Sequence, residues 1–289
     1  MVIAFIIIFI IFIMLLGIYA VFVEPWLPPR ITRHKVVVSP EALDQKPLQI
    51  VVMTDLHACW PWMRPERITR IVERVNSLEP DLIALLGDYH TAMHPPFAKP
   101  LASAAAWAQP MQHLKAPLGV FGVLGNHDWL EGGEDAREAL EASGVTVLEN
   151  RAQRVSTRGN SHVWLLGLDD QYGEACQLHG TGRRDDLEVA LSQVEDDSAP
   201  RILLAHEPDI FLEANKSVDL TVSGHTHGGQ VRLPFIGALT IPSRLDRKYA
   251  KGAFEENGST LIVGSGLGCS GLPIRFLCPP ELLLIEIYA

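Results

Sequence analysis

The sequence predicts an α/β protein in which two packed sheets carry helices on their outer faces, preceded by one N-terminal transmembrane helix. Three observations lead to this prediction. Short apolar runs alternate with amphipathic stretches from residue 48 onward. Several of these runs end in Asp, His or Asn, and the first 23 residues carry no charged side chain. A length of 289 residues suits one large domain with an appendage.

The N-terminal segment Met1–Val23 consists mostly of Ile, Phe, Leu and Val, and Glu24 is the first charged residue. A helix of about 20 such residues spans the hydrocarbon core of a bilayer. The basic start and small-residue cleavage site of a signal peptide are poorly matched, so we expect a retained single-pass anchor. Arg30, Arg33 and Lys35 follow the span and no Lys or Arg precedes it, which predicts that the rest of the chain is cytoplasmic.

Residues 24–47 hold several prolines and are expected to be a connector between the anchor, residues 1–23, and the domain, residues 48–289.

In the first part of the domain, nearly continuous apolar runs alternate with helical periodicity, which predicts parallel strands in a sheet covered on both faces. The expected strands are 48–54, 82–86 and 119–124, and the expected helices are 65–78, 101–114 and 133–143. Pro65 opens the first helix and Gly144 ends the third.

After residue 145 the apolar runs shorten and favour a partly antiparallel arrangement. The expected strands are 152–156, 162–168, 202–205, 220–222, 238–241, 260–263 and 281–287, with a helix at 185–193.

The overall charge and the cysteines exclude some classes of protein. A net charge of −10 argues against broad binding of nucleic acid, so no nucleic-acid scaffold role is expected. Bound cations would offset this charge locally, so an anionic substrate stays compatible with it. The four cysteines show no CxxC spacing, which argues against a disulfide scaffold and favours a buried thiol at Cys59.

Five apolar runs end in side chains that bind divalent metals. These ends are Asp55-Leu56-His57, Gly87-Asp88, Gly125-Asn126-His127-Asp128, His206 and Gly224-His225-Thr226-His227. Ligands gather outside the carboxyl ends of strands in open α/β sheets, so one pocket can collect all five despite their separation in sequence. A single histidine would be explained by a core or loop position; the repetition is what predicts a metal site.

Two cations about 3.5–4 Å apart can clamp a phosphoryl group and activate water near neutral pH. Asp88 can bridge them because a carboxylate has two oxygens, and His127 is placed to protonate a leaving oxygen. Zinc-dependent amide hydrolysis is a weaker reading, since the chain has no His-Glu-x-x-His helix and Asn is a poor catalytic zinc ligand.

These five blocks, in this order, resemble the signature of the calcineurin-like metallophosphoesterase superfamily. Longer strings narrow the resemblance to a bacterial membrane-associated phosphodiesterase branch of the YkuE and YaeI type, similar also to one class of UDP-2,3-diacylglucosamine pyrophosphatases. These strings are His206-Glu207-Pro208-Asp209, Gly224-His225-Thr226-His227-Gly228-Gly229-Gln230 and Gly271-Leu272-Pro273-Ile274-Arg275.

The resemblance implies a four-layer α/β/β/α sandwich with two divalent ions, usually manganese, zinc or iron. Asp55, His57 and His227 would hold the first ion and Asn126, His206 and His225 the second, with Asp88 bridging. A metal-bridging hydroxide would attack phosphorus, and His127 would assist the leaving group.

The expected function is therefore that of a phosphoesterase, anchored in a bacterial inner membrane, which cleaves phosphodiester or pyrophosphate bonds. A lipid-linked substrate such as UDP-2,3-diacylglucosamine is attractive because the anchor adjoins the domain. The alternative is a non-catalytic scaffold that keeps the fold for binding a partner; such chains typically lose several ligands, whereas this one keeps them. The oligomeric state is left open.

Further residues have two readings each. Asp128 either orients His127 or caps the next turn. His90 and His94 either touch substrate or metal, or are solvated loop histidines. Arg183 and Arg184, in the Gly-rich segment 171–184, either bind phosphate or form a solvated face. Asp169-Asp170 lie either at the rim of the pocket or in a turn. The apolar tip Leu233–Ile236 either dips into lipid or lines an acyl pocket, or is buried against the core, and burial is the safer expectation.

Overall fold

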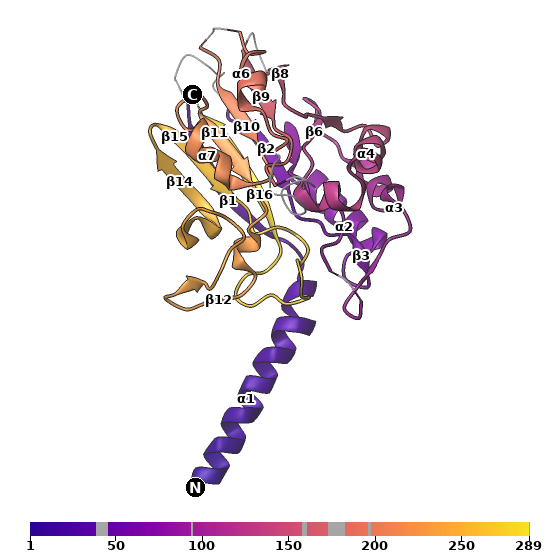
Figure 1. Ribbon diagram of the computed structural model, residues 1–289, viewed down its shortest axis with the longest axis vertical. Helices are drawn as coiled ribbons and strands as arrows, with labels where there is room; N and C mark the ends of the chain where they lie inside the picture. The colour runs from indigo at the N-terminus through magenta and orange to yellow at the C-terminus, as the bar shows by residue number, and fades with distance from the viewer. Residues whose placement is uncertain (39–45, 94, 158–160, 173–182, 196–197, 289) are drawn as a thin grey trace.

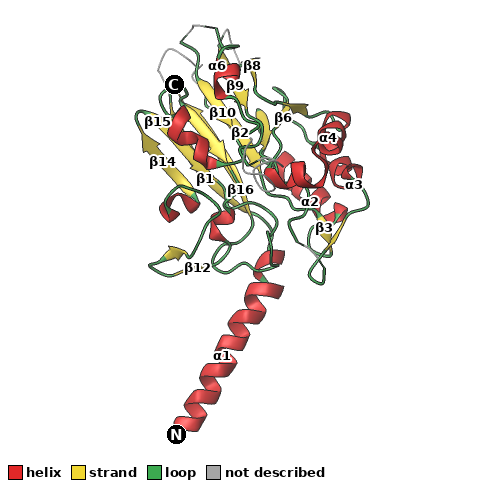
Figure 2. Ribbon diagram, in the orientation of Figure 1, coloured by secondary structure: helices red, strands yellow, loops and turns green. Residues whose placement is uncertain are grey.

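The computed structural model describes residues 1–38, 46–93, 95–157, 161–172, 183–195 and 198–288. Two six-stranded sheets pack face to face, helices lie on their outer faces, and a long N-terminal helix projects from one end (Figures 1 and 2). This is the four-layer α/β/β/α arrangement that the sequence predicts.

The first sheet has the strand order β1-β16-β2-β4-β6-β7. Its strands are β1 (Arg30–Val37), β16 (Glu281–Tyr288), β2 (Leu48–Met53), β4 (Leu82–Leu85), β6 (Val120–Gly122) and β7 (Thr146–Val147). Strands β2, β4 and β6 are parallel, as expected from their apolar sequences. The short strand β7, which the sequence did not predict, continues this parallel order, and β16 runs antiparallel to β2.

The second sheet has the order β14-β15-β11-β10-β9-β8. Its strands are β14 (Gly252–Glu256), β15 (Ser259–Val263), β11 (Leu220–Ser223), β10 (Arg201–Leu204), β9 (His162–Gly167) and β8 (Arg151–Ser156). The two edge strands, β8 and β14, pair antiparallel with their neighbours. The partly antiparallel second half predicted from the sequence is thereby confirmed, and β14 is a strand that the apolar pattern did not reveal.

One hydrophobic core lies between the sheets, where Ile50 and Val52 of the first sheet share a buried cluster with Leu204 and Val222 of the second. The helices and short 3-10 turns add two outer layers. They are α1 (Val2–Phe22), η1 (Glu24–Trp26), α2 (Pro65–Asn76), α3 (Ala104–Ala108), η2 (Gln109–His113), α4 (Asn126–Ala142), α6 (Leu187–Leu191), η3 (Pro208–Ile210), α7 (Phe211–Ala214), η4 (His227–Gly229) and η5 (Arg247–Ala250). Helices α2, α3 and α4 cover the first sheet, and α6 and α7 cover the second (Figure 1).

Two helices differ from the expected ranges for identifiable reasons. The helix expected over residues 101–114 is split into α3 and η2, because Pro110 cannot donate a helical hydrogen bond. The helix expected over 133–143 begins earlier, at Asn126, and bends at Gly132, whose φ is 129°. Both changes trace to single residues that interrupt regular helix geometry.

The expectation that residues 24–47 form only a connector is corrected. Arg30–Val37 is strand β1, which pairs in parallel with β16 at the edge of the first sheet. The strand expected over 238–241 is likewise shortened to β13 (Gly237–Ala238), which forms a small hairpin with β12 (Arg232–Leu233). A second two-stranded ribbon joins β3 (Cys59–Trp60) to β5 (Lys99–Pro100). The division of the chain into anchor and domain otherwise stays a prediction.

Candidate dinuclear metal centre

The predicted ligands follow strands of both sheets and meet at one end of the sandwich. Asp55 follows β2 and Asp88 follows β4, while His206 follows β10 and His225 follows β11. The ligand atoms form two groups, Asp55-His57-Asp88-His227 and Asp88-His206-His225, and within each group they all lie within 4.8 Å of one another. Asp88 belongs to both groups, which is the arrangement that two ions sharing one carboxylate require.

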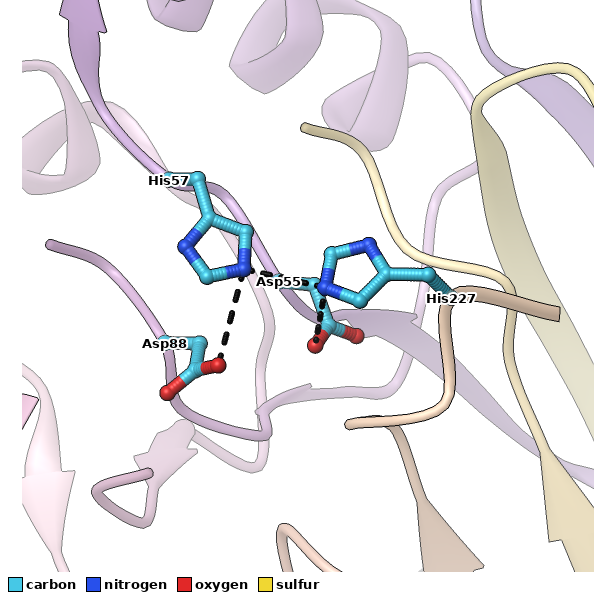
Figure 3. A group of neighbouring side chains, drawn as sticks. All are labelled: Asp55, His57, Asp88 and His227. Atoms are coloured by element: carbon cyan, nitrogen blue, oxygen red, sulfur yellow. Dashed lines mark hydrogen bonds and ion pairs between the residues drawn. The ribbon is translucent and has the colours of Figure 1, made fainter. Parts of the chain in front are cut away.

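In the first group, two carboxylates and two imidazoles face one another from three different segments (Figure 3). The Nε2 atoms of His57 and His227 are 3.0 Å apart, and Nε2 of His227 is 3.4 Å from Asp55 Oδ1. Nε2 of His57 is 3.5 Å from Asp88 Oδ2. Spacings near 3 Å suit ligands on one ion about 2 Å from each, so this set fits a divalent metal.

In the second group, Nε2 of His206 lies 3.2 Å from Asp88 Oδ2 and 3.3 Å from Nδ1 of His225. Asn126 lies at the start of α4, and its carbonyl oxygen Oδ1 is buried with no hydrogen-bond partner in the described part of the chain. A buried acceptor without a donor is costly, and a cation would satisfy it. These residues therefore also fit a divalent metal, with their individual roles as ligands remaining predictions.

Backbone carbonyls fix the tautomers of two of these rings. Nδ1 of His57 donates to the carbonyl oxygen of His90 at 2.8 Å, and Nδ1 of His206 donates to that of Leu86 at 2.6 Å. A carbonyl oxygen only accepts, so the proton sits on Nδ1 and Nε2 is directed at the site. This is the outer support typical of metal-binding histidines.

The electrostatics of the cluster are those of a site built around positive charge. Burial lowers the pKa of His57 to about 4 and that of His225 to about 3, so both rings are neutral ligands at pH 7. Burial, together with the charge of Asp88, raises the pKa of Asp55 to about 6. A bound cation would offset this penalty and favour the ionised carboxylate.

The backbone at the ligands adopts a conformation that non-glycine residues rarely take. The φ angles are 52° at Asp55, 47° at His57, 55° at Asp88, 66° at His225 and 51° at His227. Left-handed backbone at such residues costs roughly 1–3 kcal/mol each and concentrates at functional sites. Five such residues in one cluster are an independent indication that their placement serves a function.

Two glycines let the ligand loops approach each other closely. A Cβ on Gly125 would lie 2.7 Å from the backbone N of Asp88 and overlap its Oδ1. A Cβ on Gly224 would overlap Thr54 Oγ1 and lie 2.6 Å from Asp55 Oδ2. Both positions therefore need glycine because of space, and the sequence analysis gave neither of them a role of its own.

His127 lies beside the cluster rather than in it. Its backbone N–H donates to Asp88 Oδ1 at 2.9 Å, which places the residue directly over the shared carboxylate. Its ring meets the His57 ring edge-on, with the centroids 5.4 Å apart, and the residue is only partly buried. A half-exposed imidazole next to a metal cluster is positioned to exchange a proton with a bound substrate.

For Asp128 the structure favours the capping alternative. Its buried carboxylate accepts backbone N–H bonds from Gly125 and Asp88 at Oδ2, at 3.0 and 2.8 Å, and from Tyr89 and His90 at Oδ1, at 2.8 and 3.0 Å. Asp128 thus caps α4 and, at the same time, holds the loop that carries Asp88.

His90 acts on the cluster through its backbone, because its carbonyl oxygen accepts from His57. Its ring lies 3.3 Å from Asp128 Oδ1 and meets Trp107 edge-on, so it packs behind the cluster. His94 lies outside the described residues.

The two arginines of the expected substrate loop are engaged with acidic side chains. Arg183 forms ion pairs with Asp185 at 2.6 Å and with Glu213 at 2.7 Å. Arg184 stacks over the Trp129 ring at 3.4 Å and contacts Asp169 at 3.0 Å. The phosphate-binding role stays a prediction for both, and residues 173–182 between them and Tyr172 lie outside the described residues.

Three contributors to the site were not assigned a role from the sequence. Thr54 donates from Oγ1 to Asp55 Oδ2 at 2.8 Å. Tyr172 stacks on the His225 ring at 5.2 Å. Arg275 is fully buried and donates to the carbonyl oxygens of Ser265, Gly266, Gly268 and Cys278, which fixes the loop behind Asp55. Tyr172 follows a strand end like the ligands do, so its position was the one available signal.

Comparison with known proteins agrees with this geometry. The family model described as calcineurin-like phosphoesterase matches residues 48–229. An uncharacterized metallophosphoesterase from Helicobacter pylori is 31% identical over 262 residues, which cover 89% of this chain and 65% of the relative. The uncharacterized metallophosphoesterase YkuE from Bacillus subtilis is 32% identical over 279 residues, which cover 93% of this chain and 88% of YkuE.

A bovine relative named as a transmembrane protein with metallophosphoesterase domain is 33% identical over 272 residues, covering 91% of this chain and 58% of the relative. The chain thus spans less than two thirds of the bovine and Helicobacter proteins, while the match includes every predicted ligand block. With its family model covering more than half of the sequence, the chain belongs to the calcineurin-like phosphoesterase family.

Proposed function

We propose that this protein is a membrane-anchored, dinuclear metal-dependent phosphoesterase that hydrolyses phosphodiester or pyrophosphate bonds. The observation that carries the proposal is the pair of ligand groups sharing Asp88. Membership of the family supports a metal-dependent phosphohydrolase in general terms. The bond type, the substrate and the metals are parts of the proposal.

In this proposal Asp55, His57 and His227 would hold one divalent ion, Asn126, His206 and His225 would hold the other, and Asp88 would serve both. When bound, the ions supply Lewis-acid activation of the phosphoryl group and of the attacking water. Mixed oxygen and nitrogen ligation is compatible with manganese, zinc or iron.

The chain's own contribution to the chemistry is a positioned proton donor. His127 is tied to Asp88 by its backbone and leaves its ring half-exposed beside His57. It would donate a proton to the leaving oxygen as the phosphorus–oxygen bond breaks, which contributes roughly 10²–10⁴-fold to a rate. Asp128 supports this step indirectly by holding the loop of Asp88.

The location follows from the N-terminal helix. Among the described residues, α1 is the one helix that is both long enough and apolar enough to cross a membrane. We propose that it does so once in a bacterial inner membrane, with Arg30, Arg33 and Lys35 on the cytoplasmic side. A lipid-linked phosphate such as UDP-2,3-diacylglucosamine is the proposed substrate class, because the anchor holds the domain next to lipid.

The first test replaces His127. Purified His127→Ala should bind as much metal as the wild-type chain, measured by elemental analysis, and turn over an aryl phosphodiester roughly 10²–10⁴-fold more slowly. His113→Ala, which removes an exposed ring on η2, is the matched control and should keep full activity. Equal turnover by wild type and His127→Ala would remove the proton-donor role.

The second test separates the substrate classes. Wild-type protein is assayed on UDP-2,3-diacylglucosamine and on a soluble aryl phosphodiester, with and without manganese after chelation. Turnover of the lipid nucleotide supports the lipid-linked class, and turnover of the diester alone rejects it. Stoichiometric metal binding with no turnover of either would favour the non-catalytic scaffold.

A further inference from the structure

The end of α1 is bonded into the domain. Arg275 donates its backbone N–H to the carbonyl oxygen of Ala20 at 2.9 Å. The buried carboxylate of Glu24 accepts the backbone N–H of Leu277 at 2.9 Å and that of Cys278 at 2.5 Å. Arg67 donates to the carbonyl oxygen of Pro25 at 2.6 Å. The helix is therefore a fixed part of the molecule rather than a loose tether, and its direction sets which face of the domain meets the lipid.

The β12–β13 hairpin, residues 232–238, lies at this same end. Arg232 donates its backbone N–H to the carbonyl oxygen of Phe276 at 2.9 Å, and the Phe276 ring meets the Tyr19 ring of α1 edge-on at 6.5 Å. Figure 1 shows the hairpin on the side of the domain from which α1 leaves. Phe276 thus links the base of the hairpin to the last turns of the helix.

The tip of the hairpin is apolar and points away from the core. Phe235 is 110% exposed and Ile236 is 61% exposed, against the safer expectation from the sequence that they are buried. Leu277, next to the Glu24 contact, lines the same hollow as the hairpin and is also exposed. Large exposed apolar side chains grouped together mark an interaction surface.

Basic side chains lie next to this apolar tip. Arg232, Arg247 and Lys248 line the hollow under the hairpin, and Asp246 is the single acidic residue among its lining residues in the described structure. The chain as a whole carries a net charge of −10, so a cationic patch here stands out from the rest. Apolar side chains ringed by Arg and Lys are typical of surfaces that bind anionic lipid headgroups.

Exposed aromatic rings continue the surface near the helix end. Trp26 lies in η1, directly after α1, and its ring is 5.2 Å from that of Trp62. Trp60 and Phe97 are exposed on and beside the β3–β5 ribbon. Tryptophan is favoured at the boundary between lipid and water, where its amphipathic ring fits both phases.

We propose that the β12–β13 hairpin is a second membrane contact, whose tip inserts Phe235 and Ile236 into the headgroup region of an anionic leaflet. The proposal rests on the proposed membrane span of α1, since that helix determines which face is membrane-proximal. The two contacts together would restrict the tilt of the domain against the bilayer, which a single helix leaves free.

This contact deepens the proposed function because the hairpin is continuous with the metal centre. His227 and η4 lead directly into it, and the Arg232 side chain donates to the carbonyl oxygen of Gly228 at 2.9 Å. The backbone N–H of Cys278 donates to Glu24 at the helix end, and its thiol Sγ donates to the carbonyl oxygen of His227 at 3.3 Å. The proposal therefore assigns the site to phosphoesters presented at the lipid surface.

The test measures membrane depth in the full chain, independently of activity. Phe235→Cys, Ile236→Cys, Phe12→Cys and Val189→Cys are each labelled with an environment-sensitive fluorophore and reconstituted into nanodiscs of phosphatidylcholine with phosphatidylglycerol. Quenching by spin-labelled lipids then reports contact with the bilayer. Val189 is the matched control, an exposed apolar residue on α6 at the end of the molecule away from α1 (Figure 1). The unsubstituted chain corrects for labelling of native cysteines, of which Cys59, Cys269 and Cys278 are buried.

Quenching and blue-shifted emission at positions 235 and 236, with neither at 189, is the expected result. Replacing phosphatidylglycerol by phosphatidylcholine should weaken the quenching at 235 and leave that at 12 unchanged. Quenching at 12 without quenching at 235 and 236 would overturn the hairpin contact and leave the anchor intact. Quenching at 235 but not at 12 would support the hairpin and reject the span of α1, and neither result depends on whether the protein is a phosphoesterase.

Discussion

At the scale of single residues, the least expected feature is how much depends on one carboxylate outside the two candidate ligand groups. Asp128 accepts four backbone N–H bonds and so joins the start of α4 to the loop that carries Asp88. Sequence alone left two roles open for Asp128, because a residue next to His127 in the chain reveals nothing about which donors its side chain reaches. Ligand type was predictable from residue chemistry; the donors that hold each ligand depend on folded geometry.

The Asp128→Ala substitution tests this role. Four buried donors lose a charged acceptor, and hydrogen bonds to charged groups contribute about 1.5–3 kcal/mol each, so the free energy of unfolding should fall by several kcal/mol. Metal content should fall with it because the Asp88 loop is released. Thermal unfolding and elemental analysis measure both effects, and Asp135→Ala, an exposed position on the same helix, should change neither. Wild-type metal content together with unchanged stability would show that the four bonds are dispensable.

At the scale of elements, continuous apolar runs predicted the buried parallel strands. They did not predict an edge strand or the break in a helix, which depend on other signals. Strand β1 was overlooked because Arg30–Val37 mixes basic and apolar residues and pairs with β16 at the far end of the chain. An edge strand with one covered side carries a weak apolar signal, and a pairing across some 250 residues has no local signature. The break at Pro110 was in principle readable from the sequence, since proline interrupts a helix wherever it falls inside one.

Packing of two turns against each other leads to a prediction at Gly224. In Gly224→Ala the new Cβ would overlap Thr54 Oγ1 and press on Asp55, so the turns after β2 and β11 must move apart. We expect loss of metal from the first ligand group and reduced turnover, with the sheets retained by circular dichroism. Gly17→Ala adds the same carbon where nothing lies within 4 Å and should leave metal content unchanged. A Gly224→Ala protein with two bound ions would show that the close approach is not required.

At the scale of the whole molecule, the site is a product of two sheets meeting at one end. The rule that ligands gather at the carboxyl ends of strands predicted that Asp55 and His227, 172 positions apart in sequence, would converge, and they do. The rule does not cover buried groups that follow no strand end. Glu24 and Arg275 fix the helix to the metal-site loops. In sequence Glu24 looks like an ordinary surface acid, and the string that contains Arg275 does not reveal that this side chain is buried.

The pairing of β1 with β16 at the edge of the first sheet leads to a prediction about pH. Glu281, at the start of β16, accepts from Thr32 Oγ1 of β1 at 2.5 Å, from Lys251 Nζ at 2.9 Å and from the backbone N–H of Ser265 at 2.9 Å, so it joins segments from both ends of the chain. Burial alone would raise the pKa of Glu281, but Lys251 and these donors outweigh it and hold the pKa below the usual 4.5. Between the folded and unfolded pKa values the unfolded chain binds more protons, so this stabilisation is present above about pH 4.5 and is lost as the pH falls through the folded value.

In chelator-treated protein the melting temperature of wild type should therefore exceed that of Glu281→Gln near pH 7, and the difference in melting temperature should narrow on acidification below pH 4.5. Glu255→Gln, an exposed substitution on β14, should show little gap at any pH. A gap between wild type and Glu281→Gln that stays constant from neutral to acid pH would mean that the charge of Glu281 does not hold β1 to the sheet.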